Sequence, residues 1–145
     1  MTVIRLFGAE LGDSDEVIVR ALLARPVACH SMEVVGLTVD LPVSELGRSV
    51  GFYSELFQRE PDLRPEPGVA EWVLRRGPDL ALRIVATDTL GSELRVGIAV
   101  TDVESERQRL ASPAAVVTKP GIIASLSLRD PDGHHVVLWQ DLMPS

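Results

Sequence analysis

Acidic, basic and imidazole side chains fall at alternating positions of the predicted strands, where they would share one face of a sheet. Asp40 and His135 are candidate catalytic residues, because a carboxylate or an imidazole can move a proton. Arg83 and Arg95 would stabilise negative charge developing on a substrate oxygen, or bind a carboxylate or phosphate. An ion pair between Asp40 and an arginine is the alternative interpretation, in which these charges only hold the fold together.

The same alternation predicts the lining of a cavity. If the apolar residues of segment 37–43 face a helix, the residues between them face the opposite way. This step, applied to each strand, gives Thr38, Asp40, Pro42, Ala81, Arg83, Val85, Arg95, Gly97, Ala99, Thr101, His135, Val137 and Trp139. Gly97 would leave volume for a ligand, and Trp139 would stack on a planar ligand or pack in the core, an ambiguity shared by Trp72. The candidate ligand-binding residues are Thr38, Arg83, Arg95, Gly97 and Trp139.

The remaining histidines and the cysteine offer little further chemistry. Cys29 is the only cysteine, which excludes an intramolecular disulfide and a four-ligand zinc finger, and we expect it to be a buried structural thiol. His30 precedes the repeated segments, and His134 is expected to be solvated in a turn.

The composition restricts the kind of protein. The chain has 145 residues, 46% of them apolar, which suits one compact core. The formal net charge of −7 and the lack of a long basic cluster argue against nucleic-acid binding. No apolar stretch approaches the length of a membrane span, and no signal peptide is apparent. A soluble cytoplasmic protein is the expectation.

An internal duplication organises most of the chain. Segment 37–46 matches segment 94–103 position for position, and each copy predicts a strand followed by a helix. We expect Ser44 to cap the first helix, near 46–58, and Thr101 with Glu104 to form a capping box on the second, near 103–111. About three strands should follow each helix; the extended runs are 69–75 and 79–87 in the first copy and 115–118, 122–128 and 134–140 in the second.

Residues 1–33 lie outside the repeat. Residues 2–7 predict a short strand, and Asp13 with Glu16 predicts the start of a helix that ends before Pro26. We therefore expect an N-terminal strand-helix extension, 1–33, followed by a single domain, 34–145, whose modules span about 34–90 and 91–141.

Three features, together with the duplication, resemble the vicinal oxygen chelate superfamily, which includes glyoxalase I, bleomycin-resistance proteins and extradiol dioxygenases. They are the Ser49-Val50-Gly51-Phe52-Tyr53 run, the Val100-Thr101-Asp102-Val103 helix entry and the Asp130-Pro131-Asp132-Gly133-His134 turn. The resemblance implies an α+β fold of two βαβββ modules that form a curved, partly open mixed β barrel around one cavity, usually in a homodimer. The aspartates of the turn are expected to be structural rather than catalytic.

The resemblance also implies where a divalent metal would be bound. Its ligands would come from the first and last strands of each module, at Thr38, Arg95, Val137 and a position near Ala81 or Arg83. None of these is a normal metal ligand, and an arginine would repel the ion. We therefore expect no metal and no cofactor.

Three functions remain open at this stage. The first is a metal-free protein that binds a natural product or metabolite in the cavity. The second is a metal-free isomerase, cyclase or lyase, with Asp40 or His135 as acid or base and Arg83 or Arg95 as oxyanion stabiliser. The third is a metal-dependent lyase or dioxygenase with unusual ligands. Whether the protein is an enzyme is left undecided.

Overall fold

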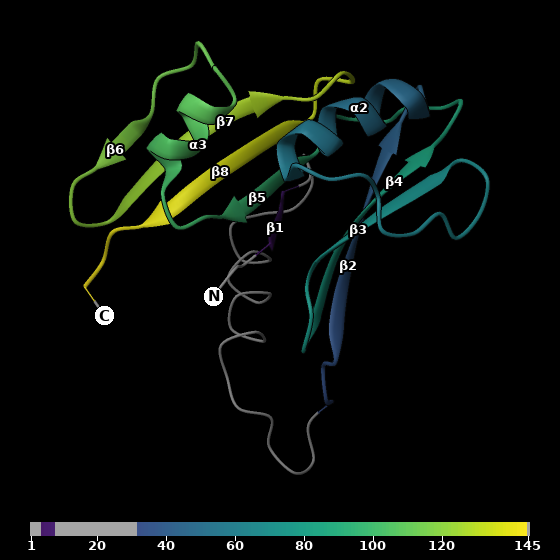
Figure 1. Ribbon diagram of the computed structural model, residues 1–145, viewed down its shortest axis with the longest axis horizontal. Coiled ribbons are helices and arrows are strands. Elements are labelled where there is room, and N and C mark those ends of the chain that lie inside the picture. Colours follow the sequence, from purple (N-terminus) through teal and green to yellow (C-terminus); the bar gives the residue numbers. More distant parts are fainter. Residues whose placement is uncertain (1–3, 8–31, 145) are drawn as a thin grey trace. The chain divides into compact units, whose positions relative to one another are not determined.

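The computed structural model describes residues 4–7 and 32–144 (Figure 1). The chain divides into two compact units, one formed by Met1–Gly12 with Glu93–Ser145 and the other by Asp13–Ser92. The barrel and the single domain 34–145 stay predictions. The helix expected after Asp13, Cys29 and His30 fall outside the described residues.

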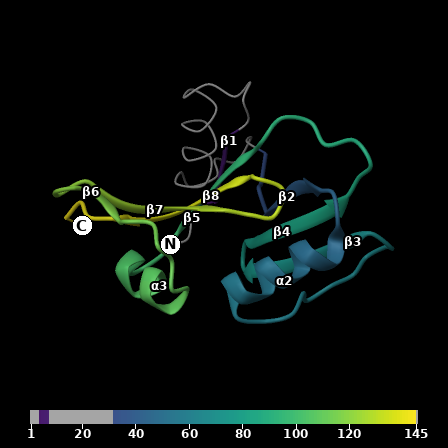
Figure 2. The ribbon, with the colours of Figure 1, turned by 90° about the horizontal axis from the view of Figure 1, so that it is seen from above.

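In its described part, residues 32–92, unit Asp13–Ser92 is a three-stranded sheet covered by one helix. It comprises β2 (Gly36–Val43), α2 (Leu46–Phe57), β3 (Val69–Arg75) and β4 (Asp79–Ala86), and the strand order is β2-β4-β3. Strands β2 and β4 are parallel, whereas β3 and β4 are antiparallel. Helix α2 lies along one face of the sheet (Figure 2). Alternate residues of β2, Val39, Leu41 and Val43, are fully buried, as the period-two pattern predicts.

The second unit is a five-stranded sheet. It comprises β1 (Ile4–Phe7), β5 (Arg95–Ala99), α3 (Val103–Arg109), β6 (Val117–Lys119), β7 (Ile123–Arg129) and β8 (His135–Asp141), in the order β1-β5-β8-β7-β6. Only the β5–β8 pairing is parallel. Figure 2 shows α3 on one side of this sheet. The N-terminal strand expected over 2–7 is present as β1, which pairs with β5.

The two copies of the repeat share one topology but differ in strand number. In each, the helix connects the first strand to later strands, and the last strand pairs with the first in parallel. The second copy has the expected three strands after its helix, whereas the first has two and an isolated bridge between Leu63 and Glu71. Pro61, Pro65 and Pro67 explain the difference, because proline lacks the N–H that a ladder requires.

Both helix caps fall one residue later than predicted. The carboxylate of Glu45, rather than the hydroxyl of Ser44, accepts hydrogen bonds from the backbone N–H groups of Gly47 and Arg48, at 3.0 and 2.7 Å. Asp102 likewise replaces the predicted capping box of Thr101 and accepts from the backbone N–H of Ser105 at 3.1 Å. Glu45 and Asp102 occupy equivalent positions of the repeat, so both copies cap their helix with a carboxylate.

The other predicted box partner, Glu104, has a different role, since it forms an ion pair with Arg107 one turn along the helix. The far end of α2 agrees with the prediction, because Gln58 adopts a left-handed conformation and closes the helix before Pro61. Helix α3 is shorter than expected and ends at Arg109.

Trp72 belongs to the core. Its side chain is fully buried under α2, and its ring centroid lies 6.0 Å from that of Tyr53 and 5.8 Å from that of Phe57. The indole Nε1 donates a hydrogen bond to the backbone carbonyl of Arg59 at 3.0 Å, so its one polar group is satisfied. The core interpretation of Trp72 is therefore confirmed. No helix in the described part of the chain is long and apolar enough to cross a membrane.

Candidate ligand-binding pocket

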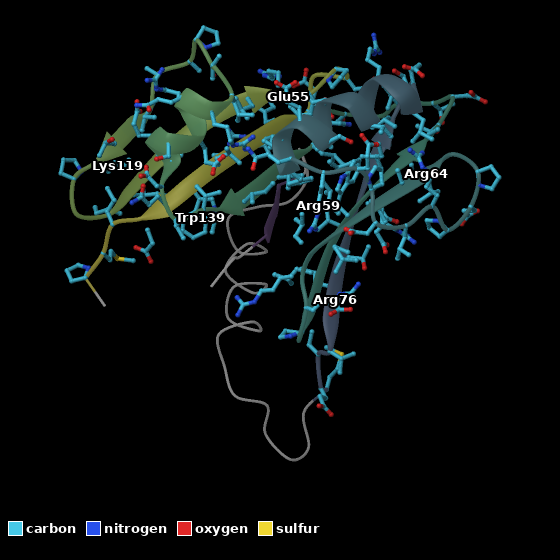
Figure 3. The ribbon with its side chains drawn as sticks, viewed as in Figure 1. Glu55, Arg59, Arg64, Arg76, Lys119 and Trp139 are labelled. Carbon is cyan, nitrogen blue, oxygen red and sulfur yellow. The ribbon has the colours of Figure 1, made fainter. Side chains whose placement is uncertain are left out.

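A pocket of about 200 Å³ lies on the face of the five-stranded sheet formed by β5, β7 and β8. Trp139 projects from β8 in Figure 3. Strand register explains the composition of the pocket: Gly97 pairs with Val137, which pairs in turn with Ser127, and Trp139 pairs with Ser125. The pocket lining consists of Arg95, Gly97, Ile123, Ser125, Ser127, Val137 and Trp139.

The opposite face of the same sheet forms the core of this unit. Its side chains alternate with those of the pocket and are almost completely buried: Val96, Ile98, Ala124, Leu126, Val136 and Leu138. Because successive side chains of a strand point to opposite faces, this apolar face fixes which residues reach the pocket.

Four predicted cavity residues line this pocket: Arg95, Gly97, Val137 and Trp139. Strand β7 contributes three lining residues that were not predicted, namely Ile123, Ser125 and Ser127. Alternation within the predicted strand 122–128 was the available signal, but using it required knowing that this strand pairs with the last one.

Asp40 and Arg83 lie in the other unit, where they form a bidentate ion pair. Arg83 donates from Nε to Asp40 Oδ1 and from Nη2 to Asp40 Oδ2, both at 2.8 Å. Glu71, the next residue in this row across the sheet, lies 3.8 Å from Arg83 Nε. The hydrogen bond from Arg83 holds the pKa of Asp40 below its usual value, which makes this carboxylate a weaker base. Thr38 is exposed on β2 next to this row.

His135 stands beside Arg95 in the register of β5 and β8, but it is not part of the pocket lining. Its Nε2 lies 3.3 Å from Glu93 Oε2, which also accepts a hydrogen bond from Arg129 Nη1 at 3.0 Å. The hydrogen bond from Arg129, with a smaller contribution from His135, lowers the pKa of Glu93. The arrangement places a carboxylate-bound imidazole next to Arg95 along the strand pair.

His134 is buried, which corrects the expectation that it is solvated. Its residue exposure is 2%, and its Nδ1 accepts a hydrogen bond from the backbone N–H of Leu94 at 3.0 Å. Asp130 Oδ1 accepts from the backbone N–H groups of Asp132 and His134, at 3.0 and 2.8 Å. Gly133 supplies the positive φ of 85° that the turn needs. Asp130 therefore holds the turn together, as predicted for this motif.

No protein-family model matches the sequence, and no curated protein matches it. Several solved structures are similar to the chain. A glyoxalase/bleomycin resistance protein from Catenulispora acidiphila aligns with a TM-score of 0.59 and 20% identity, over 72% of this chain and 96% of that one. A lactoylglutathione lyase from Agrobacterium tumefaciens aligns with a TM-score of 0.58 and 18% identity, over 72% and 91%.

A third match extends over more of the chain. A glyoxalase/bleomycin resistance protein/dioxygenase from Nocardioides aligns with a TM-score of 0.55 and 16% identity, over 91% of this chain and 95% of that one. The chain has the vicinal oxygen chelate fold. The resemblance predicted from the duplication and its helix entries is thereby confirmed at the level of the fold.

The vicinal oxygen chelate fold raises the question of a divalent metal. The pocket offers a guanidinium and two hydroxyls, and none of the described residues that line it is a His, Asp, Glu or Cys. Across residues 32–144, no three such side chains are grouped so that they could hold an ion. Imidazole and carboxylate groups are the ligands that divalent ions prefer, so this donor set does not fit a metal.

Proposed function

We propose that this protein binds a small molecule, a natural product or metabolite, in the pocket on β5, β7 and β8, as a homodimer and without metal or cofactor. The observation that carries the proposal is the composition of the pocket, where one guanidinium and two hydroxyls stand among apolar side chains. A concave, largely apolar site with a few polar groups is the usual form of a small-molecule site. The fold supports the proposal, since its solved relatives include proteins named for bleomycin resistance.

Binding is preferred to catalysis because of the state of the acid-base candidates. Asp40 is engaged by Arg83 through both carboxylate oxygens, and its pKa is lowered rather than raised toward neutrality. A general base works best when its pKa is near the operating pH. Within the described part of the chain, no carboxylate and no imidazole lines the pocket.

A metal-free isomerase, cyclase or lyase is the second candidate, and one observation favours it. His135 is the register partner of Arg95, and Glu93 lies within hydrogen-bonding distance of its Nε2. A carboxylate in this position could orient the ring for proton transfer while Arg95 stabilises an oxyanion. Under this candidate, His135→Gln abolishes turnover but leaves ligand affinity nearly unchanged.

The test begins with a native mass spectrum of the full chain as purified. A retained organic mass on a dimer agrees with the proposal, whereas one divalent ion per subunit contradicts its metal-free part. A thermal-shift screen of metabolites then supplies ligands for comparison between variants, and a screen without any stabilising compound would count against the binding function.

Two glycine variants locate the ligand. Gly97→Val fills the pocket, and its backbone φ lies outside the positive range, so a β-branched residue suits the strand. Gly91→Val is the matched control, because a Cβ there meets nothing within 4 Å. We expect Gly97→Val to lose the ligand and Gly91→Val to keep it. Equal binding by both variants would place the site elsewhere.

A further inference from the structure

We infer that the ligand of this pocket is a small amphipathic carboxylate, whose charged group contacts Arg95 and whose apolar part lies against Val137 and Trp139. The inference rests on the proposed function, because it concerns the same pocket, and it adds the chemical class and the orientation of the ligand.

The pocket runs lengthwise along the strands. In the register of the sheet, Arg95 and His135 form the first row, Gly97, Val137 and Ser127 the second, and Trp139 and Ser125 the third. Ile123 belongs to a fourth row, beyond Trp139. Successive rows on one face are two residues apart, or about 6.7 Å. The lining residues therefore form a trough with Arg95 at one end and Ile123 at the other.

The Arg95 end carries positive charge. Arg129 belongs to the same row, as the register partner of His135, so two guanidinium groups share this end. Among the described residues, the carboxylate of Glu93 lies beside them and accepts a hydrogen bond from Arg129. The planar guanidinium of Arg95 presents paired N–H donors whose geometry matches the two oxygens of a carboxylate.

The described lining residues at the other end are apolar; Lys119 and Asp141, the register partners of Ile123, share its row but are not among them. Val137 and Ile123 supply aliphatic surface, and Trp139, only 6% exposed, forms part of the wall. Gly97 has no side chain, which gives the trough its depth between the two ends. Ser125 and Ser127 add hydroxyls along β7, which suits a ligand with one further polar group. The apolar end thus fits a short alkyl chain or a single ring.

The size of the pocket restricts the ligand further. Its volume of about 200 Å³ lies below the roughly 300 to 1,000 Å³ of sites for drug-sized molecules. The net charge of −7 would attract cations from a distance. Salt screens such long-range attraction beyond about 8 Å at physiological ionic strength, so the contact with Arg95 decides the sign of the bound group.

Matched probes test the inference by isothermal titration calorimetry of the full chain. Octanoate and phenylbutyrate carry the carboxylate, octanamide and phenylbutyramide are the neutral counterparts, and octylamine is the cationic one. We expect each acid to bind about tenfold or more tightly than its amide, because a charge-assisted hydrogen bond is stronger than a neutral one. Added salt should weaken the acids and leave the amides unchanged.

Substitutions of arginine identify the group responsible. Arg95→Gln should bring the ratio of acid to amide affinity close to one, and Arg95→Lys should retain part of it. Arg64→Gln is the control, because it removes the same charge from an exposed position in the other unit and should leave the ratio unchanged.

The inference is overturned if the amides bind as tightly as the acids, if octylamine binds most tightly, if no acid binds, or if Arg95→Gln keeps the preference. The proposed function fails separately. If a neutral or cationic metabolite binds the native chain but not Gly97→Val, the proposed function is supported. Only the inference that the ligand is a carboxylate is then contradicted. Octanoate binding that Gly97→Val does not disturb contradicts both.

Discussion

Arg83 donates hydrogen bonds to both carboxylate oxygens of Asp40, each at 2.8 Å. The two residues are register partners on the parallel strands β2 and β4, so the sheet itself brings them together. A carboxylate held in this way is stabilised in its charged form. Arg83 and Arg95 were both predicted to line a cavity. Arg83 forms this ion pair instead, whereas Arg95 lines the pocket.

Asp40→Asn is therefore predicted to have little effect on ligand binding. We expect the affinity for a pocket ligand to change by less than about threefold, since an exposed ion pair contributes little and the pocket lies on another sheet. Calorimetry with octanoate checks this. If Asp40 were the base of an enzyme, the same variant would abolish turnover while leaving the affinity intact.

Acidification should destabilise the protein. Asp40, Glu93, Asp102 and Glu104 all have lowered pKa values, caused mainly by hydrogen bonds from Arg83, Arg129, Ser105 and Arg107 respectively. The unfolded chain then binds protons more readily than the folded one in this pH range. The stabilisation is complete above the usual pKa values, 3.8 for Asp and 4.5 for Glu, and is lost as the pH falls through the lower values of the folded state.

Thermal melts between neutral pH and about pH 3, a range spanning these usual pKa values, measure the effect. The double variant Asp40→Asn with Glu93→Gln should lose less of its Tm over this range than the native chain, because two of the four carboxylates no longer titrate. Parallel curves for the two proteins would show that these residues do not carry the pH dependence.

His134→Leu should destabilise the fold. The substitution removes the Nδ1 that accepts from the backbone N–H of Leu94 and leaves this part-buried donor without its partner. The expected cost is about 1 to 3 kcal/mol in the free energy of unfolding, measured by urea denaturation. His135→Leu is the control, because the partner of its Nε2 is the exposed carboxylate of Glu93, and a smaller change is expected. Equal losses would mean that the hydrogen bond to Leu94 contributes nothing.

The helix caps give a test within each copy of the repeat. Glu45→Ala and Asp102→Ala should each lower the Tm by a few degrees, since each removes a side-chain acceptor from the first turn of a helix. Ser44→Ala and Thr101→Ala, one residue earlier, should have less effect. A larger loss of Tm from Ser44→Ala or Thr101→Ala would support the prediction that these hydroxyls cap the helices.

The sequence predicted the elements better than their polar contacts. Strand β3 occupies the predicted span 69–75, and the other predicted strands in residues 32–144 lie within two residues of their observed ends, because alternation and flanking Gly or Pro are local signals. The burial of His134 was not predictable in this way. It depends on Leu94, which is remote in sequence and reaches the turn only when β5 and β8 pair.

In the candidate site, too, local patterns were predictable and contacts that depend on strand pairing were not. Alternation on β5 and β8 was sufficient to place Arg95, Gly97, Val137 and Trp139 on one face. The serines of β7 were missed because alternation within one strand does not reveal which strand pairs beside it in the sheet. Asp40 and Arg83 were assigned to one face as well, and their parallel pairing on β2 and β4 decides between an ion pair and two independent groups.

The antiparallel pairing of β1 with β5 has a consequence for biosynthesis. Ile4–Phe7 precedes β2, α2, β3 and β4 in the chain, whereas Arg95–Ala99, its partner among the described strands, follows all of them. During translation the unit Asp13–Ser92 therefore has all its strands available first. This edge of β5 can therefore be covered by β1 only after β2, α2, β3 and β4 have all been translated.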